Sequence, residues 1–219
     1  MKRLTILCSV FAVSSGLCAW PGTVALAQSV PPTQSAPPAP TQPALREELL
    51  AMMAQDQRTL DLQTTDPQAF EAIQLRFQSR IQDIVARHGW PTIGLVGEDG
   101  AKAAWLLVQH RDADRPYQLR MLELMAPLVK TGEVSGANYA YLYDRTHRPQ
   151  RYGTQGRCVR EGRGGWEPFI IEDLPALHDR RRAMGLPPIA DYAARFSCPA
   201  TAVAFLAGAG PTVPVPGDR

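Results

Sequence analysis

Apolar residues recur at helical spacing along much of the chain, and two helices follow directly from that pattern. The first is predicted over residues 46–62. The second begins at Asp66-Pro67, because Asp is a favoured N-cap and Pro is favoured at the first helical position. Its apolar side chains follow a three-four spacing and share one face: Phe70, Ile73, Phe77, Ile81 and Ile84. His88 is the next member of this face, so we expect His88 to point toward the core and Gly89 to end the helix.

The third helix is predicted to be the most deeply buried. Gly97–Gly100 opens it, and between Ala101 and Val108 the only charged residue is Lys102. A helix that is apolar all round is a buried one, so this segment should form the centre of the domain. It is too short to cross a bilayer. His110 continues an apolar face at its end, as His88 does on the preceding helix.

The rest of the chain predicts further helices and one hairpin. Two helices are expected over residues 114–130 and 136–145. Alternating residues around a Gly-rich turn then predict a β-hairpin at 151–159 and 166–171, and short helices should follow at 174–184 and 188–196. The expected fold class is mainly α (α+β), a compact multi-helix domain with a buried central helix and one small β-hairpin.

The N-terminus has the three-part pattern of a secretory signal peptide. A basic start, Met1–Arg3, precedes an apolar run, Leu4–Trp20, and Ala25–Ala27 supplies the small residues of a cleavage site before Gln28. The alternative is an uncleaved membrane anchor, for which the apolar run is short and interrupted by serine and glycine. We therefore expect an exported protein, periplasmic or secreted, with no membrane span after cleavage.

Composition divides the chain into four parts. Residues 1–27 form the signal peptide, and residues 28–44 are a Pro-rich tether expected to be disordered. A single globular α-rich domain is expected over residues 45–200, followed by an apolar and then Pro-rich tail at 201–219.

The charge balance argues against a nucleic-acid partner. Loss of Lys2 and Arg3 with the signal peptide leaves 21 of the 23 basic residues, which equals the 21 acidic residues. Nucleic-acid binding requires a clustered positive surface, and a mature chain with no net charge does not indicate one.

Two cysteines remain in the mature chain, Cys158 and Cys198. In an oxidising compartment an even number of cysteines predicts a disulfide, which would close a loop of about forty residues. The alternative is a reactive thiol, which requires a histidine or a helix terminus beside one of the cysteines.

Several segments, taken in their order along the chain, resemble a bacterial family of domains of unknown function. They are His88-Gly89-Trp90-Pro91, Val96-Gly97 to Gln109-His110, Tyr141-Leu142-Tyr143-Asp144-Arg145, Gln150-Arg151-Tyr152-Gly153-Thr154-Gln155, and Ile171 through Leu186. The resemblance spans roughly residues 80–192 and implies a mostly helical domain with a small hairpin. It implies no reaction, because the family has no assigned activity. From this resemblance we expect the two cysteines to be peculiar to this chain.

No motif in the sequence identifies a cofactor or metal site. The four histidines lack a short ligand spacing and no Cys-x-x-Cys occurs, so we expect no metal. No Gly-x-Ser-x-Gly nucleophile turn and no Gly-rich phosphate loop occur either. No cofactor is therefore expected.

A set of polar and aromatic side chains remains as the candidate site. The catalytic candidates are His88, His110 and Tyr152, and the ligand-binding candidates are Gln109, Asp144, Arg145, Gln155 and Trp90. The functional hypothesis places both histidines, Tyr152 and Gln155 in one cleft beside the hairpin. The structural alternative treats the histidines as hydrogen-bonded core residues, Asp144-Arg145 as a cap with a surface ion pair, and Trp90 as core.

Three functional classes follow from the sequence. The first is a binding or accessory module of the cell envelope, whose partner is an unidentified small molecule or envelope component, because no complete catalytic constellation is visible. The second is a hydrolase-type enzyme that uses histidine acid–base chemistry in the cleft. The third is a structural partner of another envelope protein, which the Pro-rich tether favours.

Overall fold

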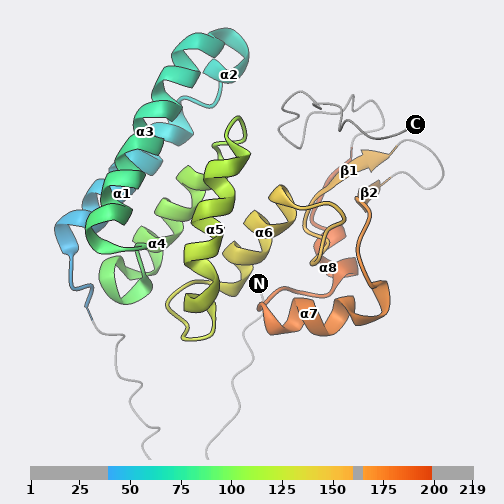
Figure 1. Ribbon diagram of the computed structural model, residues 1–219. Coiled ribbons are helices and arrows are strands. Elements are labelled where there is room, and N and C mark those ends of the chain that lie inside the picture. The colour runs from blue at the N-terminus through green and yellow to red at the C-terminus, as the bar shows by residue number, and fades with distance from the viewer. Residues whose placement is uncertain (1–38, 160–164, 199–219) are drawn as a thin grey trace, which may run out of the picture. The chain divides into compact units, whose positions relative to one another are not determined.

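The structure is a computed structural model that describes residues 39–159 and 165–198 (Figure 1). The described elements are helices and one antiparallel hairpin, all within one compact unit, Pro38–Arg219. In chain order they are α1 (Pro43–Arg58), α2 (Leu62–Thr65), α3 (Pro67–His88), α4 (Ile93–Gln109), α5 (Arg115–Val129), α6 (Gly136–Thr146), β1 (Gly156–Val159), β2 (Gly165–Pro168), the 3-10 helix η1 (Leu174–Ala176), α7 (Leu177–Ala183) and α8 (Ile189–Ala193). The predicted mainly helical fold with one small hairpin is confirmed.

Five predicted parts of the chain lie outside the described residues. They are the signal peptide (1–27), the first part of the tether (28–38), most of the Gly-rich turn of the hairpin (160–164), the end of the predicted domain (199–200) and the tail (201–219). None of the helices within 39–159 and 165–198 combines the length and apolar character needed to cross a membrane.

Helix α1 begins earlier and ends earlier than its apolar pattern predicts. It starts at Pro43, inside the predicted tether, because Pro is compatible with the first turn of a helix, where its missing N–H leaves no bond unmade. It ends at Arg58 rather than residue 62, where the Thr59 hydroxyl donates to two carbonyls of the last turn. Leu62–Thr65 forms the separate short helix α2.

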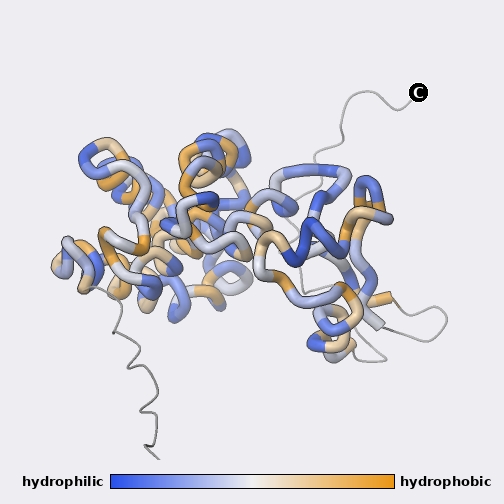
Figure 2. The backbone as a smooth tube through the Cα atoms, turned by 90° about the horizontal axis from the view of Figure 1, so that it is seen from below, coloured by the Kyte–Doolittle hydropathy of each residue, from blue (hydrophilic) through white to orange (hydrophobic). Residues whose placement is uncertain are grey.

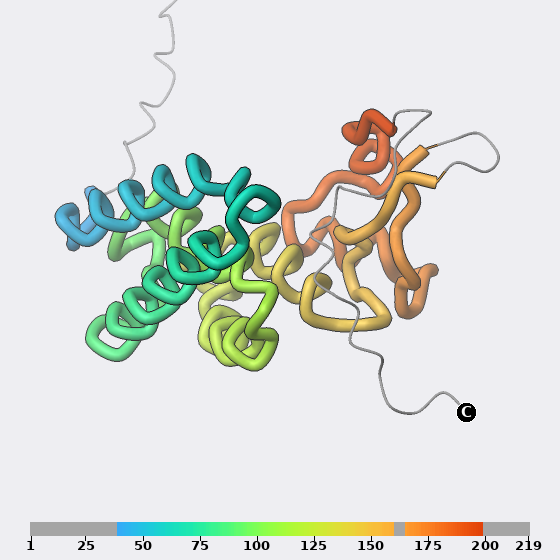
Figure 3. Tube along the Cα trace, turned by 90° about the horizontal axis from the view of Figure 1, so that it is seen from above, coloured from blue at the N-terminus to red at the C-terminus, as the bar shows by residue number. Residues whose placement is uncertain are grey.

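Helices α1 and α4 run parallel, and α3 lies antiparallel beside them. The Thr41 N–H donates to the Gly94 carbonyl, and Arg46 pairs with Asp99. Partner numbers thus increase together, which fixes the parallel direction. Between α1 and α3, Glu48 pairs with Arg80, and the later residue Asp56 bonds to the earlier residue Gln74. Partner numbers on α3 thus decrease as those on α1 increase, which fixes the antiparallel direction. The two helices lie side by side in Figures 1 and 3.

Helix α4 is the buried centre of the domain, as predicted. It contacts α1, α3, α5 and α6, and its buried side chains are Val96, Ala101, Ala103, Ala104, Trp105, Leu107 and Val108. On the surrounding helices hydrophilic and hydrophobic positions alternate turn by turn (Figure 2). The helix starts at Ile93, where the Thr92 hydroxyl caps it, and Gly97 interrupts its geometry with φ 75° and ψ 166°.

The end of α3 departs from the prediction. The Asp66 cap is confirmed, because its carboxylate accepts the Ala69 N–H at 3.0 Å. His88, however, is exposed, so the expectation that it points toward the core is wrong. Periodicity gives the direction of a side chain but not whether a neighbour stands opposite. The buried residue at this end of the core is Trp90, which follows the turn at Gly89.

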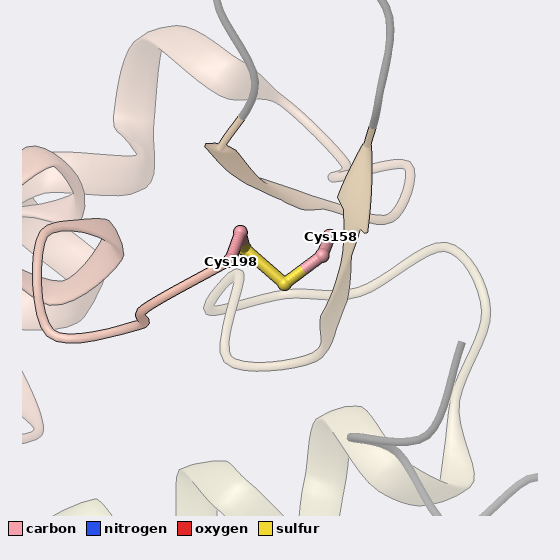
Figure 4. The surroundings of a disulfide bond; sticks show 2 residues. All are labelled: Cys158 and Cys198. Atoms are coloured by element: carbon pink, nitrogen blue, oxygen red, sulfur yellow. A yellow bond between two sulfur atoms is a disulfide. The ribbon is translucent and has the colours of Figure 1, made fainter. Parts of the chain in front are cut away.

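The hairpin is shorter than predicted, and a disulfide joins it to the chain after α8. Strands β1 and β2 pair from Gly156↔Pro168 to Val159↔Gly165, so residues 151–155 and 169–171 are not strand, contrary to the prediction. Cys158 on β1 is bonded to Cys198, with an S–S distance of 2.06 Å and a Cα–Cα distance of 5.5 Å (Figure 4). The predicted disulfide is confirmed, which excludes the reactive-thiol alternative for the bonded form.

Candidate functional site

A buried carboxylate holds His110 at the end of the central helix. Asp56 of α1 is completely buried, and its Oδ2 lies 2.6 Å from Nδ1 of His110. Gln74 of α3 donates to the other oxygen at 2.7 Å, and Gln57 donates to Oδ2 at 3.0 Å. Burial raises the pKa of Asp56, but the hydrogen bond and charge of His110 and the two amide donors outweigh it, so this pKa lies below its ordinary value.

The Asp56–His110 pair has the geometry of a histidine that a carboxylate orients. An ionised carboxylate only accepts hydrogen bonds, so Nδ1 of His110 donates to Asp56 and Nε2 is the nitrogen that can exchange a proton. The His110 side chain keeps 22% of its surface exposed, whereas Asp56 has none. The arrangement of base and orienting group is the one used in acid–base catalysis.

Two amide oxygens, one on α3 and one on α4, have no hydrogen-bond partner among the described residues. They are Oε1 of Gln74 and Oε1 of Gln109, both shielded from solvent. Buried polar atoms in native proteins are generally hydrogen-bonded. These two amides add polar character to a core that is otherwise built from apolar helix faces.

Asp144 on α6 organises the segment that precedes the hairpin. Its side chain has no exposed surface and accepts the backbone N–H groups of Arg151, Tyr152 and Thr154 at 2.8–3.0 Å, together with the Thr154 hydroxyl at 2.9 Å. These N–H groups cannot then serve a β-ladder, which explains why the predicted strand does not begin at residue 151. The structural alternative is therefore wrong for Asp144, which is a buried acceptor, whereas Arg145 does form an ion pair, with Asp112.

Gln150 and Arg181 complete the support of residues 150–155, here called the 150–155 loop. The Gln150 side chain accepts the Gln155 N–H at 2.7 Å and donates to the carbonyls of Gln155 and Phe169. Arg181 of α7 donates to the carbonyl of Tyr152 at 2.6 Å, and burial lowers the pKa of its guanidinium. The loop is therefore held from both sides by buried polar side chains.

Gly153 in this loop cannot be replaced without strain. Its φ is +65°, a conformation that side-chain-bearing residues rarely adopt. A Cβ at this position would lie 2.8 Å from Cδ1 of Ile171. The close approach of backbone and side chain fixes the path of the loop.

Tyr152 lies inside an aromatic cluster and is poorly suited to acid–base work near neutral pH. It is 5% exposed and packs edge-on against Tyr143 with ring centroids 5.7 Å apart. Burial raises the pKa of Tyr152 to about 12. A phenol with this pKa stays protonated at neutral pH, and the ring of Tyr152 contributes to packing.

A second feature is a cavity of about 470 Å³ beside α4, here called the Trp90 pocket. Its apolar lining comes from two indoles and neighbouring aliphatic side chains: Trp90, Ile93, Ala101, Trp105, Met125 and Val134. Its polar lining comes from α4 and from the start of α6: Glu98, Lys102, Ser135 and Asn138. Trp105 is 8% exposed, and its indole N–H is buried without a described partner. The lining thus combines an apolar wall with a few polar groups, which is the usual composition of a small-molecule site.

The structure separates the predicted catalytic residues. His88 is exposed at the end of α3, His110 is paired with Asp56, and Tyr152 packs on α6. Among the described hydrogen bonds and aromatic contacts none joins one of these three to another, and the Trp90 pocket contains none of them. The geometry therefore lends no support to a cleft shared by them.

The predicted ligand-binding residues have three different roles. Trp90 lines the pocket, as a ligand residue would. Arg145 forms a bidentate ion pair with Asp112, and the Gln155 side chain donates to the Thr154 hydroxyl at 3.2 Å, so both side chains are engaged within the protein. Gln109 ends α4 with its side-chain oxygen buried and without a described partner.

Asp56 and Gln74 are site residues that the sequence prediction missed. A signal was present, because each stands on an apolar face: Asp56 follows Leu45, Leu49 and Met52 at helical spacing, and Gln74 stands between Phe70 and Phe77. A polar residue on such a face is buried and must find a partner. Arg181 offered the same signal, because it lies in the predicted helix 174–184 and follows Leu177 at helical spacing. Gln150 offered none, since it lies between the predicted helix 136–145 and the predicted hairpin.

One comparison with known proteins gives a match. A family model described as "Family of unknown function (DUF6624)" matches residues 43–199, which extends on both sides of the segment that carried the sequence resemblance. No curated protein and no solved structure matches the chain.

Proposed function

The chain belongs to the family of unknown function DUF6624, and from its geometry we propose that it is an exported binding module of the cell envelope. The Trp90 pocket is the proposed ligand site. The observation that carries the proposal is the composition of this pocket, where two largely buried indoles stand beside four polar side chains. The signal-peptide pattern at residues 1–27 supports the compartment.

The polar side chains of the pocket indicate the chemistry of the ligand. Glu98 and Lys102 stand one helical turn apart at exposed positions, so they present opposite charges on one face of α4. Ser135 and Asn138 contribute hydroxyl and amide groups from the start of α6. A ligand with one carboxylate, several hydroxyl or amide groups and a partly apolar ring matches this lining. An acidic amino sugar from a cell-wall glycan has these groups.

We expect N-acetylmuramic acid to bind the mature protein, and Lys102→Gln to weaken that binding by about tenfold. N-acetylglucosamine, which lacks the carboxylate, should bind no better to the wild type than to this variant. Isothermal titration calorimetry measures both. The matched control is Lys130→Gln, because Lys130 is also exposed and lies outside the pocket lining.

Equal binding of both sugars, or equal loss in the two lysine variants, would contradict the proposed site. Thermal unfolding of the variants serves as a check on folding, since exposed lysines are expected to change stability by less than about 0.5 kcal/mol.

A hydrolase that uses His110 as a general base is the second candidate, and the Asp56–His110 geometry favours it. In this form the reaction takes place at the end of α4 and does not involve His88 or Tyr152. His110→Ala should then lower the rate of hydrolysis of a chromogenic acetate ester at least about 100-fold. His88→Ala is the matched control, because His88 is exposed and makes no described contact with Asp56. Equal rates in both histidine variants would exclude this candidate.

A further inference from the structure

A second cavity of about 680 Å³ lies beside the hairpin, and none of the residues that line it also lines the Trp90 pocket. Its charged lining is Arg148, Arg157 and Glu167, and its apolar lining includes Pro149, Phe169 and Ile170. Arg157 and Glu167 are directly opposed across β1 and β2. We call this site the hairpin cavity.

The arginines of this region divide into two groups. Between residues 144 and 159 there are four, and two of them have carboxylate partners: Arg145 with Asp112, and Arg151 with Glu172 at 3.5 Å. Arg148 and Arg157 are the other two, and both line the cavity. Within residues 39–159 and 165–198 Arg148 makes no ion pair with a carboxylate. The two cationic groups at the cavity thus face one carboxylate, Glu167.

Arg148 is positioned rigidly for contact with a ligand. Its Nη1 donates to the carbonyls of Asp144 and His147, and its guanidinium stands 5.0 Å above the Phe169 ring. A guanidinium fixed in this way keeps its remaining N–H groups available in one plane, which suits a bidentate carboxylate. The stacking on Phe169 places the charge directly beside apolar surface.

The apolar side of the cavity is open to solvent. Ile170 is 80% exposed, the largest exposed fraction among the big apolar side chains of the described residues. A single exposed apolar residue has no significance alone. Here it adjoins Phe169 and a concave surface that already carries two guanidinium groups.

We propose that the hairpin cavity binds a free amphiphilic monocarboxylate. The carboxylate binds between Arg148 and Arg157, and the hydrocarbon body covers Phe169 and Ile170. Two cations and one anion leave a single positive charge, so a monoanion fits better than a dianion or a neutral molecule. A concave site of this volume encloses one small molecule, whereas a membrane surface would require a convex apolar face.

Octanoate is the probe, and octan-1-ol is its uncharged counterpart of equal chain length. We expect calorimetric titration to show that octanoate binds the full mature chain at least about tenfold more tightly than octan-1-ol. Arg157→Gln should weaken octanoate binding about tenfold and leave octan-1-ol binding unchanged. Ile170→Ser should weaken both. Amide NMR signals of Phe169 and Ile170 should move during the titration.

Two matched controls test whether octanoate binds at the hairpin cavity rather than elsewhere on the protein. Arg182→Gln removes an exposed arginine of α7 that pairs with Asp179 and should leave octanoate binding unchanged. Lys102→Gln, which tests the Trp90 pocket, should also leave it unchanged. Equal binding of octanoate and octan-1-ol, equal effects of the Arg157 and Arg182 variants, or binding to anionic phospholipid vesicles without binding of octanoate would each overturn the proposal.

Discussion

Asp144→Ala is expected to lower the free energy of unfolding by about 4 kcal/mol. The alanine removes the acceptor of three backbone N–H groups: those of Tyr152 and Thr154, which are buried, and that of Arg151, which is partly buried. It also removes the acceptor of the Thr154 hydroxyl. Each buried donor that loses its partner costs about 1–3 kcal/mol, and water has little access to replace the carboxylate.

Urea unfolding of the protein with its disulfide intact measures this loss. The matched control is Asp99→Ala, because Asp99 is also a hydrogen-bonded carboxylate but is half exposed and pairs with an arginine. A surface ion pair contributes at most about 1 kcal/mol, so the control should shift stability far less. A loss below about 1 kcal/mol for Asp144→Ala would show that the 150–155 loop does not depend on this carboxylate.

Replacing Cys158 and Cys198 together by serine is expected to cost about 3–4 kcal/mol of unfolding free energy. The bond closes a loop of 40 residues in sequence separation, and its removal increases the conformational entropy of the unfolded chain. The loss should concentrate at the C-terminal part. Hydrogen exchange should accelerate in β1, β2 and α8, while α4 keeps its protection because its contacts are with α1, α3, α5 and α6.

Reduction of the wild-type protein should reproduce the effect of the double variant and should have no effect on the double variant itself. Titration of free thiols before reduction should find none for Cys158 and Cys198. Reactive thiols in the unreduced protein, or unchanged stability after reduction, would contradict this prediction.

Local rules predicted the helices well, because the residues that begin, bury and end them are neighbours in sequence. Asp66 caps α3, Asp114 caps α5 and Ser135 caps α6, each by accepting a backbone N–H three residues later. The same rules placed α4 at the centre, since a segment with one charge in eight residues has no polar face to expose.

The candidate site depends on contacts that no local rule can supply. His110 is bonded to a residue 54 positions earlier, and the amides that Asp144 accepts lie seven to ten positions later in a segment whose alternation predicts a strand. Alternation reports which side chains could face one way, but the strand forms only where a partner strand takes the backbone N–H groups. The Asp144 carboxylate accepts the backbone N–H groups that this strand would need, so no strand forms there.

The parallel packing of α1 on α4 sets an order of events during synthesis. Thr41 contacts Gly94 and Asp56 contacts His110, so α1 and the residues before it are synthesised 53 or 54 positions ahead of their partners on α4 and at its end. At about 5–20 residues per second, that delay is about 3–11 seconds. Throughout it the apolar face of α1, with Leu45 and Leu49, has no α4 to cover it, although both are buried in the finished fold. A chain whose synthesis has not yet reached α4 carries this uncovered helix at the N-terminal end of its domain.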